Sequence, residues 1–128
     1  MTLQKQSYSV HFYRNSETGR VPVREYLDSL SPKEQGKLTG RIRLLRDFEG
    51  RLTTDYARCL QEGIWELRSD VQRRLQRITY VIVSGKRIIL LHGFTKKGDK
   101  TPEQEIDRAI RYLQDFKATN QSIRYEEE

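Results

Sequence analysis

The sequence predicts an α+β protein built on a compact, mainly antiparallel sheet, and three observations lead to this prediction. Three strand-like runs follow one another between residues 64 and 100, a fourth lies near the N-terminus, and three other segments have helical periodicity. The chain has 128 residues, which is long enough to bury a core but too short for two ordinary domains. We therefore expect a single domain over residues 1–128, with its core at about 8–117.

The N-terminal part predicts one strand and two helices. Residues 8–13 alternate between two sets of side chains, as in a half-buried strand. Pro22 begins a short helix, and Ser31 begins a second one, because Ser31 and Glu34 have the spacing of a capping box and Gly50 is placed to end the helix. The apolar residues at helical spacing are Val23, Tyr26, Leu27 and Leu30 in the first helix and Leu38, Ile42, Leu45 and Phe48 in the second. Residues 51–63 have no clear period, which predicts a loop or a short helical turn.

Residues 64–100 predict a three-stranded meander, and a last helix follows it. The ranges 65–68, 75–83 and 88–94 are rich in β-branched and aromatic side chains, and a Ser-Gly pair at 84–85 supplies a turn. Thr101 and Gln104 repeat the capping-box spacing, so we expect them to begin the last helix. The apolar stripe that should pack on the sheet is Ile106, Ala109, Ile110, Leu113 and Phe116. Residues 119–128 are polar and predict a frayed tail.

Positive charge is concentrated in the same central segment. The chain has 24 Lys and Arg against 18 Asp and Glu, a net charge of +6, and residues 64–100 alone hold nine basic and three acidic residues. A positive field confined to one surface attracts polyanions. Nucleic acid is therefore the first partner to consider.

The composition argues against several kinds of site and location. Cys59 is the only cysteine, and the two histidines, His11 and His92, are far apart in the sequence, so we expect neither a disulfide nor a structural zinc site. We expect no metal and no cofactor. His11 is interpreted as structural, because an isolated histidine in a strand seldom acts in catalysis. The chain has no run of 18 apolar residues and no apolar signal-peptide core, which predicts a cytoplasmic protein without a membrane partner.

Three polar side chains interrupt the apolar runs of the predicted meander. They are Arg68, Arg77 and His92, and such groups are costly to bury unless they are paired or open to solvent. We therefore expect them to line a concave, partly exposed face, with His92 on the side of the leucine two positions before it. The alternative is that both arginines only pair with Glu66 or Asp70.

Four blocks of the sequence, GIWELR, RITYVI, IILLHGFTKK and KTPEQEIDRAI, resemble the RelE/ParE superfamily of toxins, in its phage-derived HigB-like branch. The resemblance covers residues 8–117. It implies a RelE-like fold with helices packed on one face of the sheet. It also implies a toxin held in check by a helix-turn-helix antitoxin similar to HigA, and a toxin–antitoxin complex that binds operator DNA. In the RelE and HigB branches it implies cleavage of mRNA on the ribosome.

The resemblance also implies roles for individual residues. Arg77 matches an arginine that contacts the scissile phosphate, and Lys97 matches a second phosphate-binding residue of the catalytic set. His92 completes that set, because an ordinary histidine titrates near neutral pH and suits a general acid or base. Resemblance and local charge together assign RNA or phosphate contacts to Arg68, Arg74, Lys96 and Lys100. The implied reaction uses the 2′-hydroxyl of the RNA as nucleophile and needs no metal.

The sequence departs from the RelE pattern in two places. RelE has basic residues where this chain has Ile64 and Glu66, and a catalytic tyrosine where this chain has Glu103, so the general acid and base stay open. A ParE-like toxin that binds gyrase without nuclease activity is one alternative, although the charge of residues 64–100 argues mildly against it. A non-enzymatic nucleic-acid-binding module is another. The chain has no obvious pair of exposed aromatic residues on which bases could stack, because Trp65 and Phe94 are expected in the core, and this argues against single-strand binding by stacking.

Overall fold

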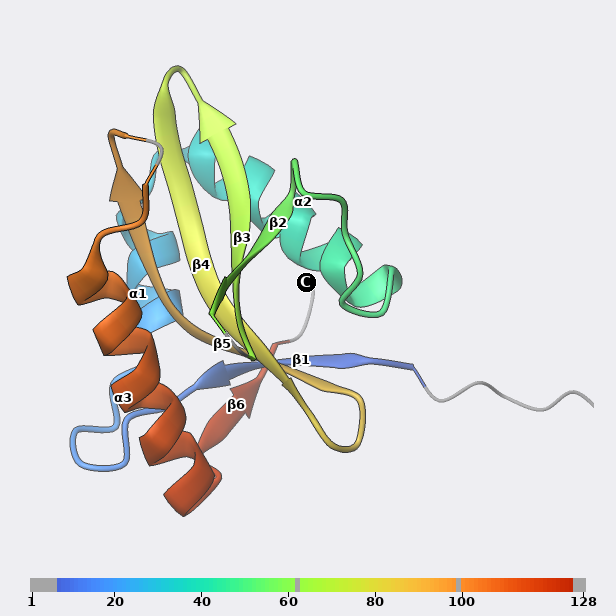
Figure 1. Cartoon of the computed structure of the whole chain (residues 1–128), viewed down its shortest axis with the longest axis vertical. Coiled ribbons are helices and arrows are strands. Elements are labelled where there is room, and N and C mark those ends of the chain that lie inside the picture. The colour runs from blue at the N-terminus through green and yellow to red at the C-terminus, as the bar shows by residue number, and fades with distance from the viewer. Residues whose placement is uncertain (1–6, 62, 99, 126–128) are drawn as a thin grey trace, which may run out of the picture.

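The computed structural model describes residues 7–61, 63–98 and 100–125, which form three helices and a six-stranded sheet (Figure 1). The elements are β1 (Ser9–Tyr13), α1 (Pro22–Ser29), α2 (Pro32–Asp47), β2 (Ala57–Gln61), β3 (Ile64–Val71), β4 (Arg74–Val83), β5 (Arg87–Lys96), α3 (Glu103–Thr119) and β6 (Ser122–Arg124). The strand order is β2-β3-β4-β5-β1-β6, and only β1 and β5 are parallel neighbours. The predicted α+β class, N-terminal strand and meander are confirmed.

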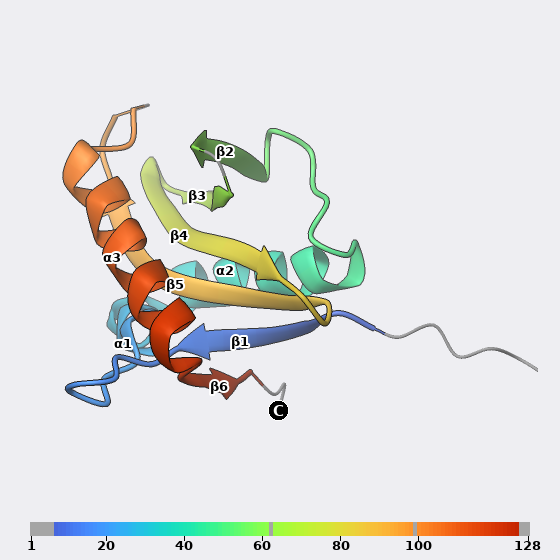
Figure 2. The same ribbon diagram turned by 60° about the horizontal axis from the view of Figure 1, so that its bottom comes forward.

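Helices cover both faces of the sheet (Figure 2). On one face, α1 and α2 pack against strand residues such as Leu67 and Leu90, whereas on the other face α3 packs through Ala109 onto residues such as Ile89. The one-sided helix packing implied by the resemblance is therefore wrong for this chain. The physical reason lies in β5, where Ile88–Leu91 are all 0% exposed. A strand that is apolar on both faces needs a cover on both.

Capping signals explain where two of the helices begin. The Ser31 hydroxyl accepts the backbone N–H of Glu34 (3.2 Å), and the Glu34 carboxylate accepts the backbone N–H of Ser31 (3.1 Å), so the predicted capping box is present. The second predicted box is wrong, because α3 begins after Pro102 without a side-chain cap. The Thr101 hydroxyl donates to Glu66 instead, which makes it part of the site described below.

Two strands lie where the sequence predicted irregular structure. β2 falls within 51–63 and β6 falls within the expected tail, of which residues 126–128 lie outside the described part. Both are edge strands of at most five residues, and Ala57 is their one buried residue among those described. Such short, exposed strands lack the alternating pattern that identifies a strand in a sequence.

The predicted core is confirmed in part: Tyr26, Leu30, Ile106, Ile110 and Leu113 of the helix stripes are only half-buried, and two predicted core residues are exposed. Phe94 is 8% exposed, and the α2 stripe is buried through Leu45, but Phe48 is 58% exposed and Trp65 is 38% exposed. Phe48 is exposed because α2 ends at Asp47, so that Phe48 is the C-cap and leaves the helical stripe. Within the described ranges, no helix is both long enough and apolar enough to cross a membrane.

Candidate functional site

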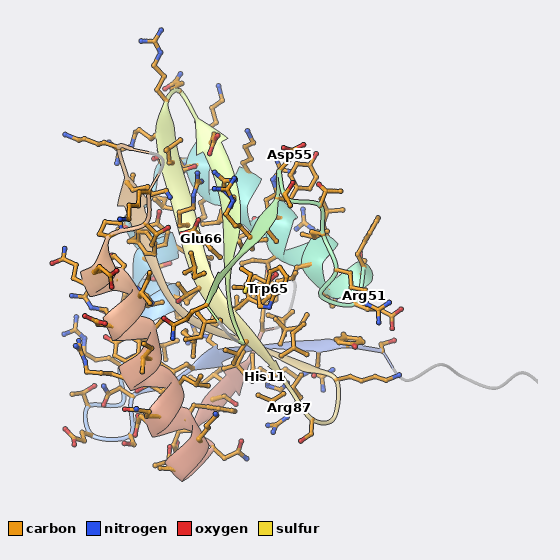
Figure 3. All side chains as sticks on the ribbon, in the orientation of Figure 1. His11, Arg51, Asp55, Trp65, Glu66 and Arg87 are labelled. Atoms are coloured by element: carbon orange, nitrogen blue, oxygen red, sulfur yellow. The ribbon has the colours of Figure 1, made fainter. Side chains whose placement is uncertain are left out.

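A buried carboxylate gathers three positive side chains on the face of the sheet that α3 covers. Glu66 on β3 is 1% exposed, and its Oε1 lies 3.5 Å from Nε of Arg77, 3.7 Å from Nζ of Lys96 and 3.9 Å from Nε of Arg68. Its Oε2 accepts the hydroxyl of Thr101, and that hydroxyl also accepts from Nζ of Lys96 (3.1 Å). We call these five residues the Glu66 cluster. Figure 3 shows Glu66 over the central strands of the sheet.

Strand alternation in the meander builds this cluster. Glu66 and Arg68 are two positions apart on β3, so both face away from Leu67, which packs in the core under α2. Arg68 lies directly opposite Arg77 in the β3–β4 register, and Lys96 follows on the next strand. Two like charges that face each other across a sheet repel. The carboxylate of Glu66 lies close to both guanidinium groups and offsets this repulsion.

Arg77 is the most enclosed member of the cluster. Its Nη1 donates to the Asp70 carboxylate (3.0 Å) and to the backbone carbonyls of Ser69 (3.1 Å) and Gln76 (2.9 Å). The side chain is 1% exposed, so the expected partial exposure is wrong. Pairing with Glu66 and with Asp70 is present. A buried cation requires such partners, because desolvation otherwise disfavours it strongly.

The accessible positive groups lie beside Arg77 on β3 and β2. The side chain of Arg68 is 17% exposed and its Nη1 donates to the carbonyl of Thr54 (3.3 Å). Arg58 is exposed and lies directly opposite Glu66 in the β2–β3 register. Sequence reasoning missed Arg58 because it missed β2. Four cations around Glu66 and Asp70 leave an excess of two positive charges, a setting that favours a bound phosphate.

Lys96 is a buried member of the cluster, 6% exposed, and lies beside Glu66 and Thr101. Burial lowers the pKa of its ammonium group, Glu66 opposes that change, and the positive charges of Arg77, Arg68 and Arg58 lower the pKa further. A lysine with a lowered pKa releases its proton more easily than an ordinary lysine and suits proton transfer.

His92 lies under α3 and is 2% exposed. Its Nδ1 hydrogen-bonds the hydroxyl of Thr79 (2.7 Å), and its ring stacks on Phe94 and meets Tyr112 of α3 edge-on. Burial lowers the pKa of His92 to about 3, and the positive charges of Arg108 and Arg111 act in the same direction. The imidazole is therefore neutral at neutral pH, and the expected partial exposure of His92 is wrong.

A β-bulge accounts for the side on which His92 lies. Tyr80 pairs with Leu90, but Thr79 pairs with His92, so Leu91 is an extra residue in β5. The extra residue reverses the alternation. His92 consequently faces α3, and the expectation that it shares a side with Leu90 is wrong.

The remaining predicted site residues lie outside the Glu66 cluster. Arg74 is on the opposite face, where its Nε donates to the Glu34 carboxylate (3.0 Å). Lys97 and Lys100 are exposed, Lys97 directly after β5 and Lys100 just before Thr101. In the part of the chain that the structure describes, no group of three or more His, Cys, Asp or Glu side chains is arranged to hold a metal ion.

One family model, described as Phage derived protein Gp49-like (DUF891), matches residues 25–114. The chain belongs to the Gp49-like family. Members of the Gp49-like family are RelE-like toxins associated with toxin–antitoxin systems, and the family implies an antitoxin partner. No curated protein sequence matches the chain. The Gp49-like match includes the whole Glu66 cluster and His92, whereas β1 and β6 lie outside it.

Proposed function

We propose that the chain is an endoribonuclease toxin of the HigB-like branch, which cleaves mRNA on the ribosome without a metal ion. The observation that carries this proposal is the Glu66 cluster, in which a buried carboxylate orients cations beside the exposed Arg58. Phosphodiester cleavage builds negative charge on the phosphate, and pre-oriented cations stabilise that charge most effectively in a site that excludes water.

The proposed reaction is attack of an RNA 2′-hydroxyl on the adjacent phosphorus. The P–O5′ bond breaks, which leaves a 2′,3′-cyclic phosphate on one product and a 5′-hydroxyl on the other. One proton leaves the 2′-oxygen and one joins the 5′-oxygen. Arg68 and Arg58 would hold the phosphate through their guanidinium groups. Lys96 is 6% exposed, so it would act as a buried positive charge behind Arg68 and would not contact the RNA itself. The exposed Lys97 and Lys100 would contact neighbouring phosphates.

Arg77 and His92 act as positioning residues in this proposal. Both side chains are buried, so RNA does not reach them in this arrangement of α3. Arg77 fixes Glu66 and Asp70 through its contacts, and His92 supports Phe94 beneath α3. Arg74, which binds Glu34 on the opposite face, would contact RNA only outside the cleavage site.

We further propose that residues 1–128 form one domain, which acts in the cytoplasm. Its partner would be a helix-turn-helix antitoxin similar to HigA, and the complex of both proteins would bind operator DNA. Such an antitoxin would neutralise the toxin by covering the Glu66 cluster or by keeping the protein from the ribosome.

Mapping RNA 5′ ends after induced expression tests the function. We expect new 5′-hydroxyl ends within translated codons. Arg68→Gln should reduce cleavage about a hundredfold, with the melting temperature nearly unchanged. Arg51→Gln, which removes an exposed charge on the loop after α2, should cleave like the parent. Folded protein that stops growth but leaves RNA intact, and inhibits DNA supercoiling, would instead establish a gyrase-directed toxin.

A further inference from the structure

A second positive surface lies at the other end of the sheet from the Glu66 cluster. It consists of Ser9 and His11 on β1, Arg87 on β5 and Arg124 on β6. Ser9 is paired with Arg87 and His11 with Arg124, so the four side chains come from three adjacent strands. Figure 3 shows His11 and Arg87 near each other at the lower end of the sheet, well apart from Glu66.

Contacts within this surface hold its polar groups in place. The Ser9 hydroxyl and Nε2 of His11 are 2.8 Å apart. Arg87 donates through Nη1 to the side-chain oxygen of Asn120 (3.2 Å) and lies against the Phe116 ring (5.8 Å from guanidinium carbon to ring centroid). A positioned guanidinium loses less entropy when an anion binds than a mobile one does.

We propose that Ser9, His11, Arg87 and Arg124 form an anion site that binds a phosphate of the RNA backbone. Naming RNA as the source of the phosphate rests on the proposed function, whereas the anion site itself does not. A hydroxyl, an imidazole and two guanidinium groups from three strands match a phosphate, whose oxygens accept hydrogen bonds in several directions. A carboxylate has two oxygens in one plane and is satisfied by a single guanidinium fork.

The electrostatics around His11 agree with an anion at this place. Burial lowers the pKa of His11, and the positive charges of Arg87 on β5 and Arg124 on β6 lower it further. A protonated His11 would lie directly opposite Arg124 on the neighbouring strand, and like charges so placed repel. A bound phosphate would relieve this repulsion and raise the pKa of His11, so binding of an RNA phosphodiester, whose own charge does not change in this pH range, should strengthen as the pH falls.

The two histidines of the chain make this proposal directly testable. Nuclear magnetic resonance of the imidazole rings follows both in one sample, with the buried His92 as internal reference. The probes are inorganic phosphate and a single-stranded oligoribonucleotide that carries 2′-O-methyl groups, so that no cleavage is possible. We expect the oligoribonucleotide to raise the titration midpoint of His11 at far lower concentration than inorganic phosphate does, without changing His92.

Matched variants separate a specific site from general charge attraction. Arg124→Gln should abolish the response of His11 to RNA and reduce the salt dependence of RNA binding, as the log–log slope, by about one. Arg51→Gln removes the same charge elsewhere and should leave the response of His11 intact. Because residues 126–128 are glutamates, a chain that ends at Tyr125 serves as a further control and should keep the response.

Several results would overturn the site. They are a His11 midpoint that RNA does not move, an equal loss of response in Arg124→Gln and Arg51→Gln, or a response that disappears in the shortened chain. An equal response to RNA and to inorganic phosphate would overturn the assignment to RNA. RNA cleavage without a His11 response would refute the anion site alone, and a His11 response without cleavage would refute the proposed nuclease alone.

Discussion

Removing the charge of Glu66 should destabilise the protein strongly. Glu66→Gln keeps the shape of the side chain but leaves Arg77 and Lys96, which are 1% and 6% exposed, without the carboxylate between them. Breaking a buried ion pair by removing one partner costs about 3–5 kcal/mol. For a chain of this length that loss corresponds to a fall in melting temperature of roughly 10–20 °C.

The pH dependence of this loss identifies its cause. Lys96 has a pKa below that of an unfolded lysine, so the unfolded state binds more protons and stability rises with pH between the two values. In Glu66→Gln the negative charge that opposes the lowering of the Lys96 pKa is gone, so this pKa falls further. The pH range over which stability rises then begins at a lower pH. The destabilisation by Glu66→Gln should therefore shrink as the pH rises through the added part of this range.

Urea denaturation followed by circular dichroism at several pH values measures both effects. Lys96→Met should restore part of the stability of Glu66→Gln, because it removes one of the uncompensated cations. Glu17→Gln, at an exposed position, is the matched control and should change the unfolding free energy by less than about 0.5 kcal/mol. A loss below about 1 kcal/mol in Glu66→Gln would refute the view that this carboxylate holds the cluster together.

Three further predictions concern packing, acid stability and metal dependence. Gly93→Ala should lower the unfolding free energy measured in urea by about 1–3 kcal/mol, because its new methyl group would clash with the Tyr26 ring. Gly36→Ala, in open space on α2, should raise it by about 0.5–1 kcal/mol, and equal effects of the two variants would contradict this packing. His92 should stay neutral down to a pH of about 3, so the unfolding free energy should fall as the pH falls below 6.5, by about 2 kcal/mol at pH 5, and a resonance of His92 that titrates near pH 6.5 would disprove its burial. RNA cleavage should survive EDTA, provided that ribosome integrity is controlled; activity that only magnesium restores would overturn the proposed 2′-hydroxyl attack.

The sequence predicted those parts of the fold that depend on local pattern. The capping box at Ser31 and the apolar runs of β3, β4 and β5 are local signals, and the structure has both. The β-bulge in β5 is not a local signal, because it exists only in the pairing with β4. The side and burial of His92 could therefore not be predicted from alternation. In the same way, the Thr101 hydroxyl hydrogen-bonds Glu66 and does not cap α3, and this contact between residues distant in sequence could not be predicted from local spacing.

The candidate site was predicted in composition more than in arrangement. Arg68, Arg77 and Lys96 are brought together by Glu66, which the sequence suggested as a possible ion-pair partner of the two arginines and as a departure from a family pattern, but not as the centre of the site. Arg58 lies at the site because it belongs to the edge strand β2, whose sequence does not alternate between apolar and polar residues. Charge patterns reveal the sign of a surface. They do not reveal which of its charges are buried, because burial follows from the pairing of strands.

The position of β1 has a consequence for the synthesis of the protein. This first strand lies between β5 and β6, so Ser9 pairs with Arg87 and His11 pairs with Arg124, and the second of these pairs joins residues near the two ends of the chain. Pairings so distant in sequence form slowly, and the pairing of β1 with β6 forms only after the last strand has left the ribosome. A growing chain would thus lack the finished sheet while it is being made. A premature stop before β6 would leave β1 without one of its two neighbours, so interrupted translation should yield fragments that do not complete the fold.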